Sequence, residues 1–193
     1  KTYLPVIIGN SCVIRSNFHK KTNFKYEIII KPNMSFGTGH HETTQLIIKE
    51  LLKKPPFKKN VLDIGSGTGI LSILSEKLGA KKVDSIDICK SSMHSAKENF
   101  KINQCSKINF HLGTVDEISS KNYDNILVNI EKNVILNEAK SYLKKLALYG
   151  VLYVTGFFFS DEDIIVKKIE NLNLKLKEKK RKNIWSLLIF KKI

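Results

Sequence analysis

The sequence has little cysteine, and what it has follows no site pattern. Its three cysteines, Cys12, Cys89 and Cys105, are far apart and form no Cys-x-x-Cys pair, which argues against a disulfide framework and against a zinc site. No apolar run is long enough to cross a bilayer, and the first residues lack the regions of a secretory signal. We therefore expect a cytoplasmic protein without a metal.

Arginine is also scarce, although basic residues are abundant. The 193 residues carry a formal net charge of +15, and Arg15 and Arg181 are the only arginines among 33 basic residues. Because planar, bidentate recognition of phosphates and bases favours arginine over lysine, the charge does not by itself indicate nucleic-acid binding. One explanation of the lysine-rich composition is an AT-rich genome, which favours Lys, Ile and Asn codons together. An acidic partner such as an RNA is the other.

Strand and helix patterns alternate along the chain. The sequence predicts strands at 5–8, 12–15, 26–31, 61–64, 83–86, 108–112, 126–130, 151–154, 174–180 and 184–190. Helical patterns fall between the later strands, and a basic turn at 177–182 is expected to form the tip of a terminal hairpin. Alternation of this kind predicts an α/β fold with a mostly parallel sheet covered on both faces. The hairpin would add an antiparallel C-terminal edge strand.

Four local signals predict where elements begin and end. Thr43 or Thr44 can cap the first helix, and Gly79 is expected to end the second. Ser160 with Asp163 resembles a capping box. Gly150 is expected to precede a strand.

A glycine-rich loop follows the strand at 61–64 and precedes a helix. Gly65, Gly67 and Gly69 permit positive φ and close approach of the backbone to a ligand, and the helix start supplies free N–H groups. The Gly-x-Gly-x-Gly spacing differs from that of dinucleotide enzymes and suits S-adenosylmethionine, which has a carboxylate and a sulfonium. Asp87 ends the next strand, where it can accept ribose hydroxyls. Asp63 is either an acid that orients the loop or an ordinary strand-end residue.

The clearest family signal is the segment 33–44, Asn-Met-Ser-Phe-Gly-Thr-Gly-His-His-Glu-Thr-Thr. Together with 61–70 and the Leu-Val-Asn-Ile of 127–130, it resembles the PrmA family, whose members methylate the large-subunit ribosomal protein L11. The resemblance covers about residues 24–160. It implies a Rossmann-like class I methyltransferase fold, S-adenosylmethionine as methyl donor and a ribosomal large-subunit protein as substrate. The resemblance implies cofactor contacts at Thr44, Gly65, Asp87 and Asn129, and it suggests that residues 36–40, with Phe36 and Thr38, fold over the methionine end of the cofactor. The glycine-rich loop itself adds Gly67 and Asp63 as candidate cofactor residues.

The sequence departs from the family pattern in two places. Glu42 stands where family members commonly carry Pro, and Glu131 and Lys132 stand where they carry small residues. Family members usually have a separate N-terminal domain that recognises the substrate. We therefore expect residues 1–32 to be strands or a linker from such a domain, which is missing here, and residues 33–193 to be the cofactor-binding catalytic domain.

No general base is evident in the sequence. An amine must be neutral before it is methylated, which at pH 7 costs about 4–5 kcal/mol for a lysine of pKa ~10.4 and about 1 kcal/mol for an α-amino group. We expect Asn129 and neighbouring carbonyls to orient the amine, with its proton passing to solvent. His40 and His41 are rival bases. Trp185 and Phe157 are expected in the core or at a hydrophobic rim, with Phe157 able to face the pocket.

Three functions stay open at this point. The first is methyl transfer to amino groups, either lysine side chains or an N-terminal amine, of a ribosomal protein, with ribosomal RNA as a further contact. The second is methylation of RNA or a small molecule, against which residues 129–132 lack the Asn-Pro-Pro-Tyr type of motif. The third is a non-catalytic, ribosome-associated module that binds the cofactor without turnover.

Overall fold

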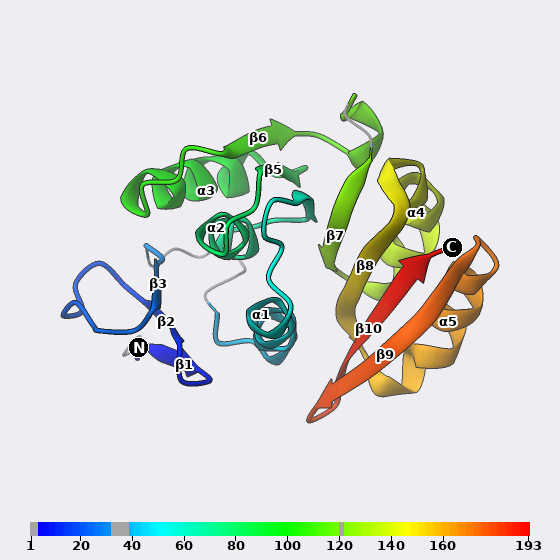
Figure 1. Cartoon of the computed structure of the whole chain (residues 1–193), viewed down its shortest axis with the longest axis horizontal. Coiled ribbons are helices and arrows are strands. Elements are labelled where there is room, and N and C mark those ends of the chain that lie inside the picture. Colours follow the sequence, from blue (N-terminus) through cyan, green and yellow to red (C-terminus); the bar gives the residue numbers. More distant parts are fainter. Residues whose placement is uncertain (1–3, 32–38, 120–121) are drawn as a thin grey trace.

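The computed structural model describes residues 4–31, 39–119 and 122–193. Its larger sheet has seven strands in the order β6-β5-β4-β7-β8-β10-β9 (Figure 1). In chain order they are β4 (Asn60–Ile64), β5 (Lys82–Asp87), β6 (Ile108–Leu112), β7 (Tyr123–Asn129), β8 (Leu146–Phe158), β9 (Leu174–Lys182) and β10 (Trp185–Lys192). The strands from β6 to β8 pair in parallel, whereas β10 is antiparallel to both β8 and β9. The predicted α/β class with an antiparallel C-terminal edge is confirmed.

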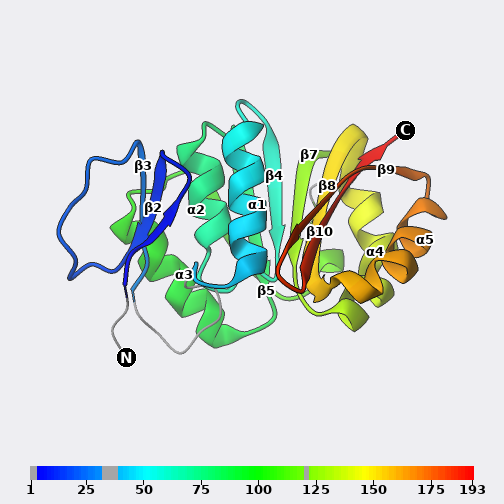
Figure 2. The ribbon, with the colours of Figure 1, turned by 90° about the horizontal axis from the view of Figure 1, so that it is seen from below.

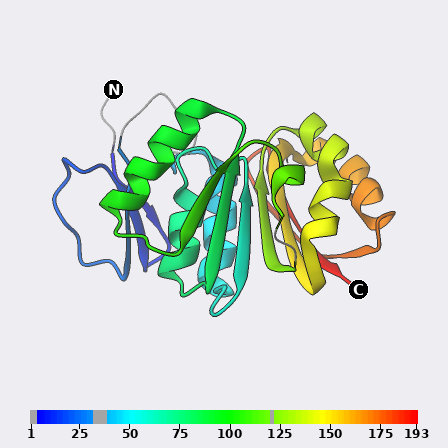
Figure 3. The same ribbon diagram turned by 90° about the horizontal axis from the view of Figure 1, so that it is seen from above.

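Helices cover both faces of this sheet. They are α1 (Glu42–Lys53), α2 (Ile70–Lys77), α3 (Lys90–Ile102), α4 (Lys132–Lys145) and α5 (Glu162–Glu170). Residues of α1, α2 and α3 belong to one hydrophobic core, and residues of α4 and α5 belong to the other. Accordingly, α1 lies in front of the sheet in Figure 2 and behind it in Figure 3, and α4 does the reverse.

Side chains alternate between the two cores along the central strands. In β7, Leu127 belongs to the core under α1, whereas Ile126 and Val128 belong to the core under α4, and all three are fully buried. This period of two is what a parallel strand covered on both faces requires. Burying each such side chain contributes about 1.5–3 kcal/mol, so the covered sheet is the main source of stability.

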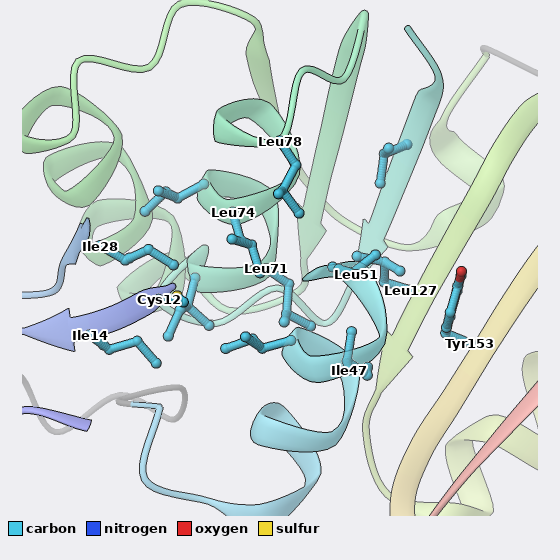
Figure 4. Packing of buried hydrophobic residues seen from close by; sticks show 14 of the residues in the cluster. Cys12, Ile14, Ile28, Ile47, Leu51, Leu71, Leu74, Leu78, Leu127 and Tyr153 are labelled. Carbon is cyan, nitrogen blue, oxygen red and sulfur yellow. The ribbon is translucent and has the colours of Figure 1, made fainter. Parts of the chain in front are cut away.

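A small sheet packs on the same core as α1 and α2. It consists of β1 (Val6–Ile8), β2 (Cys12–Arg15) and β3 (Tyr26–Ile29), with β1 and β2 antiparallel and β2 and β3 parallel. Figure 4 shows Cys12, Ile14 and Ile28 from this sheet pointing toward Leu71 and Leu74 of α2. Strands β1 to β3 are therefore held against the body of the protein.

Asn99 of α3 and Asn103, the C-cap of that helix, continue the edge of β3. Asn103 accepts from the N–H of Ile29 at 2.9 Å and donates to its carbonyl at 2.6 Å, and Asn99 accepts from the N–H of Lys31 at 2.9 Å. Asn99 also donates to the carbonyl of Thr68 at 3.0 Å. These amides satisfy edge groups that would otherwise need another strand. They also tie the end of β3 to the glycine-rich loop.

Several predicted boundaries were wrong. Thr43 and Thr44 lie inside the first turn of α1 and are buried; the N-cap is His41, whose Nδ1 accepts from the N–H of Thr43 at 3.4 Å. The Ser160 and Asp163 capping box does not form, because Ser160 belongs to a short 3-10 helix (Phe159–Asp161) that precedes α5. Gly79, with φ +89°, does follow the end of α2 as expected.

The C-terminal strands also differ from expectation. β8 begins at Leu146 rather than after Gly150, and its pairing with β7 is interrupted between Leu146 and Val151, where Tyr149 has a φ of 62°. The basic residues 177–182 lie in β9 rather than in a turn. β9 is an edge strand, and outward lysines at an edge oppose pairing with another chain.

Within the described residues, no helix is both long and apolar enough to cross a membrane.

Gly156 of β8 has no room for a side chain. Its φ is +103°, and a Cβ built there would lie 2.1 Å from the carbonyl oxygen of Ile130. We predict that Gly156→Ala lowers the free energy of unfolding by at least about 3 kcal/mol, because both the backbone strain and a backbone clash must be relieved. Gly9, with φ +60° and open space around it, is the control: Gly9→Ala should cost about 1 kcal/mol of strain. Urea denaturation measures both, and equal losses would contradict the steric argument.

Glu162 fastens the C-terminal hairpin to α5. Its carboxylate accepts from Arg181 Nε and Nη2 at 2.7 Å each and from Ser186 Oγ at 2.7 Å. The hydrogen bonds from Arg181 outweigh the desolvation of the carboxyl and lower the pKa of Glu162 from 4.5 to about 2. The contribution to stability is therefore complete above pH 4.5 and is lost as the pH falls toward 2.

We expect Glu162→Gln to lower the free energy of unfolding by about 1–2 kcal/mol at pH 7, because the arginine is half exposed and solvent weakens the pair. The difference from the wild type should shrink as the pH is lowered from 4.5 toward 3 in urea titrations. The exposed neighbour Asp163, changed to Asn, serves as control. A difference that grows on acidification would refute the assignment.

Candidate functional site

A cavity of about 560 Å³ opens at the carboxyl ends of the parallel strands. The strand register explains why its walls meet there. Ile64 of β4 pairs with Ile86 of β5 on one side and with Val128 of β7 on the other, so the residues that follow, Gly65, Asp87 and Asn129, converge. All three line the cavity. This is the edge of an α/β sheet at which ligands bind.

The glycine-rich loop forms the floor of the cavity. Gly65 has a φ of +66°, and a Cβ there would lie 2.2 Å from Cγ2 of Ile130. Gly69 caps α2 with a φ of +76°, where a Cβ would meet the Phe100 ring at 2.3 Å. Ser66 is 7 % exposed and lines the cavity, and its hydroxyl has no hydrogen-bond partner among the described residues. A buried hydroxyl without a partner indicates that a polar ligand belongs here.

Asp87 is bound to the loop it faces. Its Oδ2 accepts from the N–H of Gly67 at 2.9 Å, and its Oδ1 accepts from the N–H of Cys89 at 2.9 Å. An ionised carboxylate has about four acceptor positions. The two backbone bonds therefore fix the carboxylate and leave it able to accept two further hydroxyls.

Asp63 lies beneath the loop and is 1 % exposed. Ser72 of α2 donates to its Oδ2 at 2.6 Å. Desolvation raises the pKa of Asp63 to about 6, against the opposing effect of the serine hydrogen bonds. The acid thus joins the end of β4 to the first turns of α2, across the loop between them.

Asn129 and Thr44 meet at the other end of the cavity. Asn129 Nδ2 donates to Thr44 Oγ1 at 3.2 Å, which links the end of β7 to α1. Next to them the ring of Trp185 packs edge-on against His41, with 4.6 Å between centroids. Both rings line the cavity, so this end has an aromatic wall.

Sequence reasoning missed several wall residues. Trp185, Gly156 and Val134 line the cavity, as do residues 113–115 after β6. The position of residues 113–115 just after a strand was an available signal. Phe157, by contrast, is 2 % exposed and packs in the core under α4. The predicted contacts Phe36 and Thr38 lie outside the described residues.

The charge of the cavity is opposite to that of the chain. Its acidic side chains are Asp63, Asp87, Glu131 and Glu138, and no lysine or arginine lines it among the described residues, although the sequence has 33 of them. Apolar side chains of Ile64, Ile86 and Ile88 cover the wall beside Asp87. Such a cavity fits a ligand that is positively charged, polar at one part and flat and apolar at another. It disfavours a phosphate.

The comparisons with known proteins agree with this geometry. The family profile described as ribosomal protein L11 methyltransferase (PrmA) matches residues 1–193. Proteins named ribosomal protein L11 methyltransferase from Phocaeicola vulgatus and from Bacteroides thetaiotaomicron are each 38% identical over 190 residues, covering 97% of this chain and 68% of the relative.

Solved structures show the same relationship. A crystal structure described as ribosomal protein L11 methylase from Lactobacillus delbrueckii subsp. bulgaricus superposes with a TM-score of 0.91 at 26% identity, covering 100% of both chains. An N-methyltransferase from Bradyrhizobium japonicum, solved with S-adenosyl-L-homocysteine, shares the fold at 15% identity with a TM-score of 0.63, covering 79% of this chain and 89% of that one. The chain belongs to the ribosomal protein L11 methyltransferase (PrmA) family.

Proposed function

We propose that this chain transfers methyl groups from S-adenosylmethionine to amino groups of ribosomal protein L11. The observation that carries the proposal is a cavity lined by carboxylates and by no described lysine or arginine, at the point where Asn129 meets Thr44. A cationic methyl donor and an amine acceptor both suit such a cavity. The relatives' names supply the protein substrate. RNA and small-molecule methylation are not favoured by these names.

The cofactor, when bound, supplies a methyl group attached to a positively charged sulfur. Asp87 is proposed to hold the ribose hydroxyls, and the loop containing Gly65 and Gly67 to approach the cofactor through its backbone. Asp63 would support that loop from below, and the free Ser66 hydroxyl offers another polar contact. The family resemblance adds Thr44, Asn129, Phe36 and Thr38 as proposed contacts.

Asn129 is proposed to position the amine. Its Nδ2 is engaged by Thr44, and its Oδ1 has no donor among the described residues, so the oxygen is available to an amine N–H. Holding the nucleophile in line with the methyl group can account for a large part of a rate enhancement. His41 Nδ1 lies 2.8 Å from Thr43 Oγ1, and His40 Nε2 lies 3.1 Å from the carbonyl of Leu4. We therefore assign no histidine as base and let the proton pass to water.

Ribosomal RNA is proposed as a contact outside the cavity. The exposed cations of the edge strand β9 are Lys175, Lys177, Lys179 and Arg181, of which Lys179 and Arg181 also pair with Glu162 of α5. A row of cations at this spacing can follow a phosphate backbone.

We propose that the protein acts in the cytoplasm. We also propose that residues 1–32 connect the catalytic domain 33–193 to a substrate-recognition domain.

Cofactor binding can be followed through the single tryptophan, because Trp185 lines the cavity. We predict that S-adenosylmethionine changes its fluorescence saturably and that Asp87→Asn weakens binding about tenfold or more, since a charged acceptor is lost. Asp163→Asn, which removes an acid from the surface of α5, is the control and should bind as the wild type does. Wild-type affinity in Asp87→Asn would remove that residue from the site.

Turnover is tested by the intact mass of ribosomal protein L11 after incubation with the chain and S-adenosylmethionine. We expect mass gains in steps of one methyl group, and a loss of about 100-fold in kcat for Asn129→Ala, because the amine is no longer oriented. Asn137→Ala, on the exposed side of α4, is the matched control. Full turnover by Asn129→Ala with normal cofactor binding would refute its role, and no mass gain by the wild type would refute the substrate.

A further inference from the structure

One of the four cavity carboxylates differs from the others in its bonding. Asp63 accepts from a serine hydroxyl at 2.6 Å, Asp87 from two backbone N–H groups, and Glu138 from a tyrosine hydroxyl at 3.1 Å. Glu131 is exposed, and the one hydrogen bond that its carboxylate makes among the described residues is a long one of 3.3 Å, from the N–H of Asn133 to Oε1. Its other carboxylate oxygen is available to a ligand.

Glu131 lies at the Asn129 end of the cavity, where the acceptor amine is proposed to bind. It follows Asn129 by two residues and is the N-cap of α4. Glu131, Val134 and Glu138 all line the cavity, at the i, i+3, i+7 spacing that puts residues on one face of a helix. The first turn of α4 follows the end of β7 directly, since β7 ends at Asn129 and α4 begins at Lys132.

Lys132, the cation next to Glu131 in the sequence, pairs with another acid. Lys132 Nζ instead lies 2.9 Å from Asp161 Oδ1, in the segment before α5. Between Glu131 and Glu138 on this face of α4 lies the apolar side chain of Val134, which is 36 % exposed. A free carboxylate beside apolar surface fits a primary ammonium carried on an aliphatic stem, as in a lysine side chain.

We propose that Glu131 captures the protonated acceptor amine and directs it into the cavity. The proposal rests on the proposed function. The unpartnered, buried Ser66 hydroxyl in the same cavity independently indicates that a ligand binds there. Glu131 is a positioning residue and not a base, because a neighbouring carboxylate favours the charged form of an amine. The ammonium must give one proton to water, and a remaining N–H stays hydrogen-bonded to Glu131 while the freed lone pair forms the new N–C bond as the S–C bond breaks.

Capture of this kind has a recognisable kinetic pattern. An interaction made with the bound acceptor and kept equally in the transition state lowers KM and leaves kcat unchanged. An exposed ion pair of this sort is also weakened by salt. A merely structural role as helix N-cap would instead show as lower stability, with no dependence of KM on ionic strength.

The test compares Glu131→Gln and Glu131→Lys with Glu170→Gln, which removes the same charge at the exposed far end of α5. With ribosomal protein L11 at low salt, we expect KM to rise about three- to fivefold in Glu131→Gln and further in Glu131→Lys. The kcat values should stay within about twofold, and the differences in KM should disappear at about 0.5 M salt. Glu170→Gln should match the wild type. An unchanged KM in Glu131→Gln, or a fall in kcat at constant KM, would overturn the proposal.

A binding measurement separates this proposal from the proposed function. n-Butylammonium chloride, titrated while Trp185 fluorescence is recorded, should bind the wild type at least about threefold more tightly than Glu131→Gln, and neutral n-butanol should show no such difference. If the wild type does not methylate ribosomal protein L11, the proposed substrate fails, whereas this titration still decides the role of Glu131. Equal binding of n-butylammonium by both proteins would overturn the capture role.

Discussion

The site depends on how closely three backbones approach one another at Ile130. Its side chain fills the space where a Cβ of Gly65 would be, and its carbonyl oxygen fills the space where a Cβ of Gly156 would be. The ends of β4, β7 and β8 can therefore meet only because two of them carry glycine here. Asn129, the residue before Ile130, is by this contact brought beside the glycine-rich loop. Without the close approach at Ile130, Asn129 and the glycine-rich loop would not line the same cavity.

Peripheral elements are fastened to this centre by polar side chains rather than by further core. Asn99 connects the end of β3 to the glycine-rich loop, as its amide bonds to Lys31 and to Thr68 show. At the other end of the cavity, Asn183 of the C-terminal hairpin donates to Glu42 at 3.0 Å. Both links join a segment far away in the sequence to an element that lines the cavity. These hydrogen bonds hold the walls of the site in place without burying further apolar surface.

The parts of the fold that follow local rules could be predicted from the sequence. The alternation of strands and helices, the glycine-rich loop and the position of Asp87 all depend on a few neighbouring residues, and each was found where it was expected. The basic segment 177–182 was misjudged because a run of lysines resembles a solvated turn, whereas an edge strand exposes alternate side chains equally well. Helix capping by His41 was missed because Thr43 and Thr44, the better capping residues, are buried inside the first turn.

Non-local contacts set the limit of prediction for the site. Trp185 stands 144 positions after His41 in the sequence, and their ring contact follows from the order β7-β8-β10 in the sheet, which no local pattern encodes. The acidic character of the cavity is likewise invisible in a chain of net charge +15, because it depends on which side chains the fold turns inward. Since salt screens charges beyond about 8–10 Å, the surface lysines and the cavity carboxylates act on different ligands. The proposed RNA contact and the proposed capture of an ammonium therefore do not exclude each other.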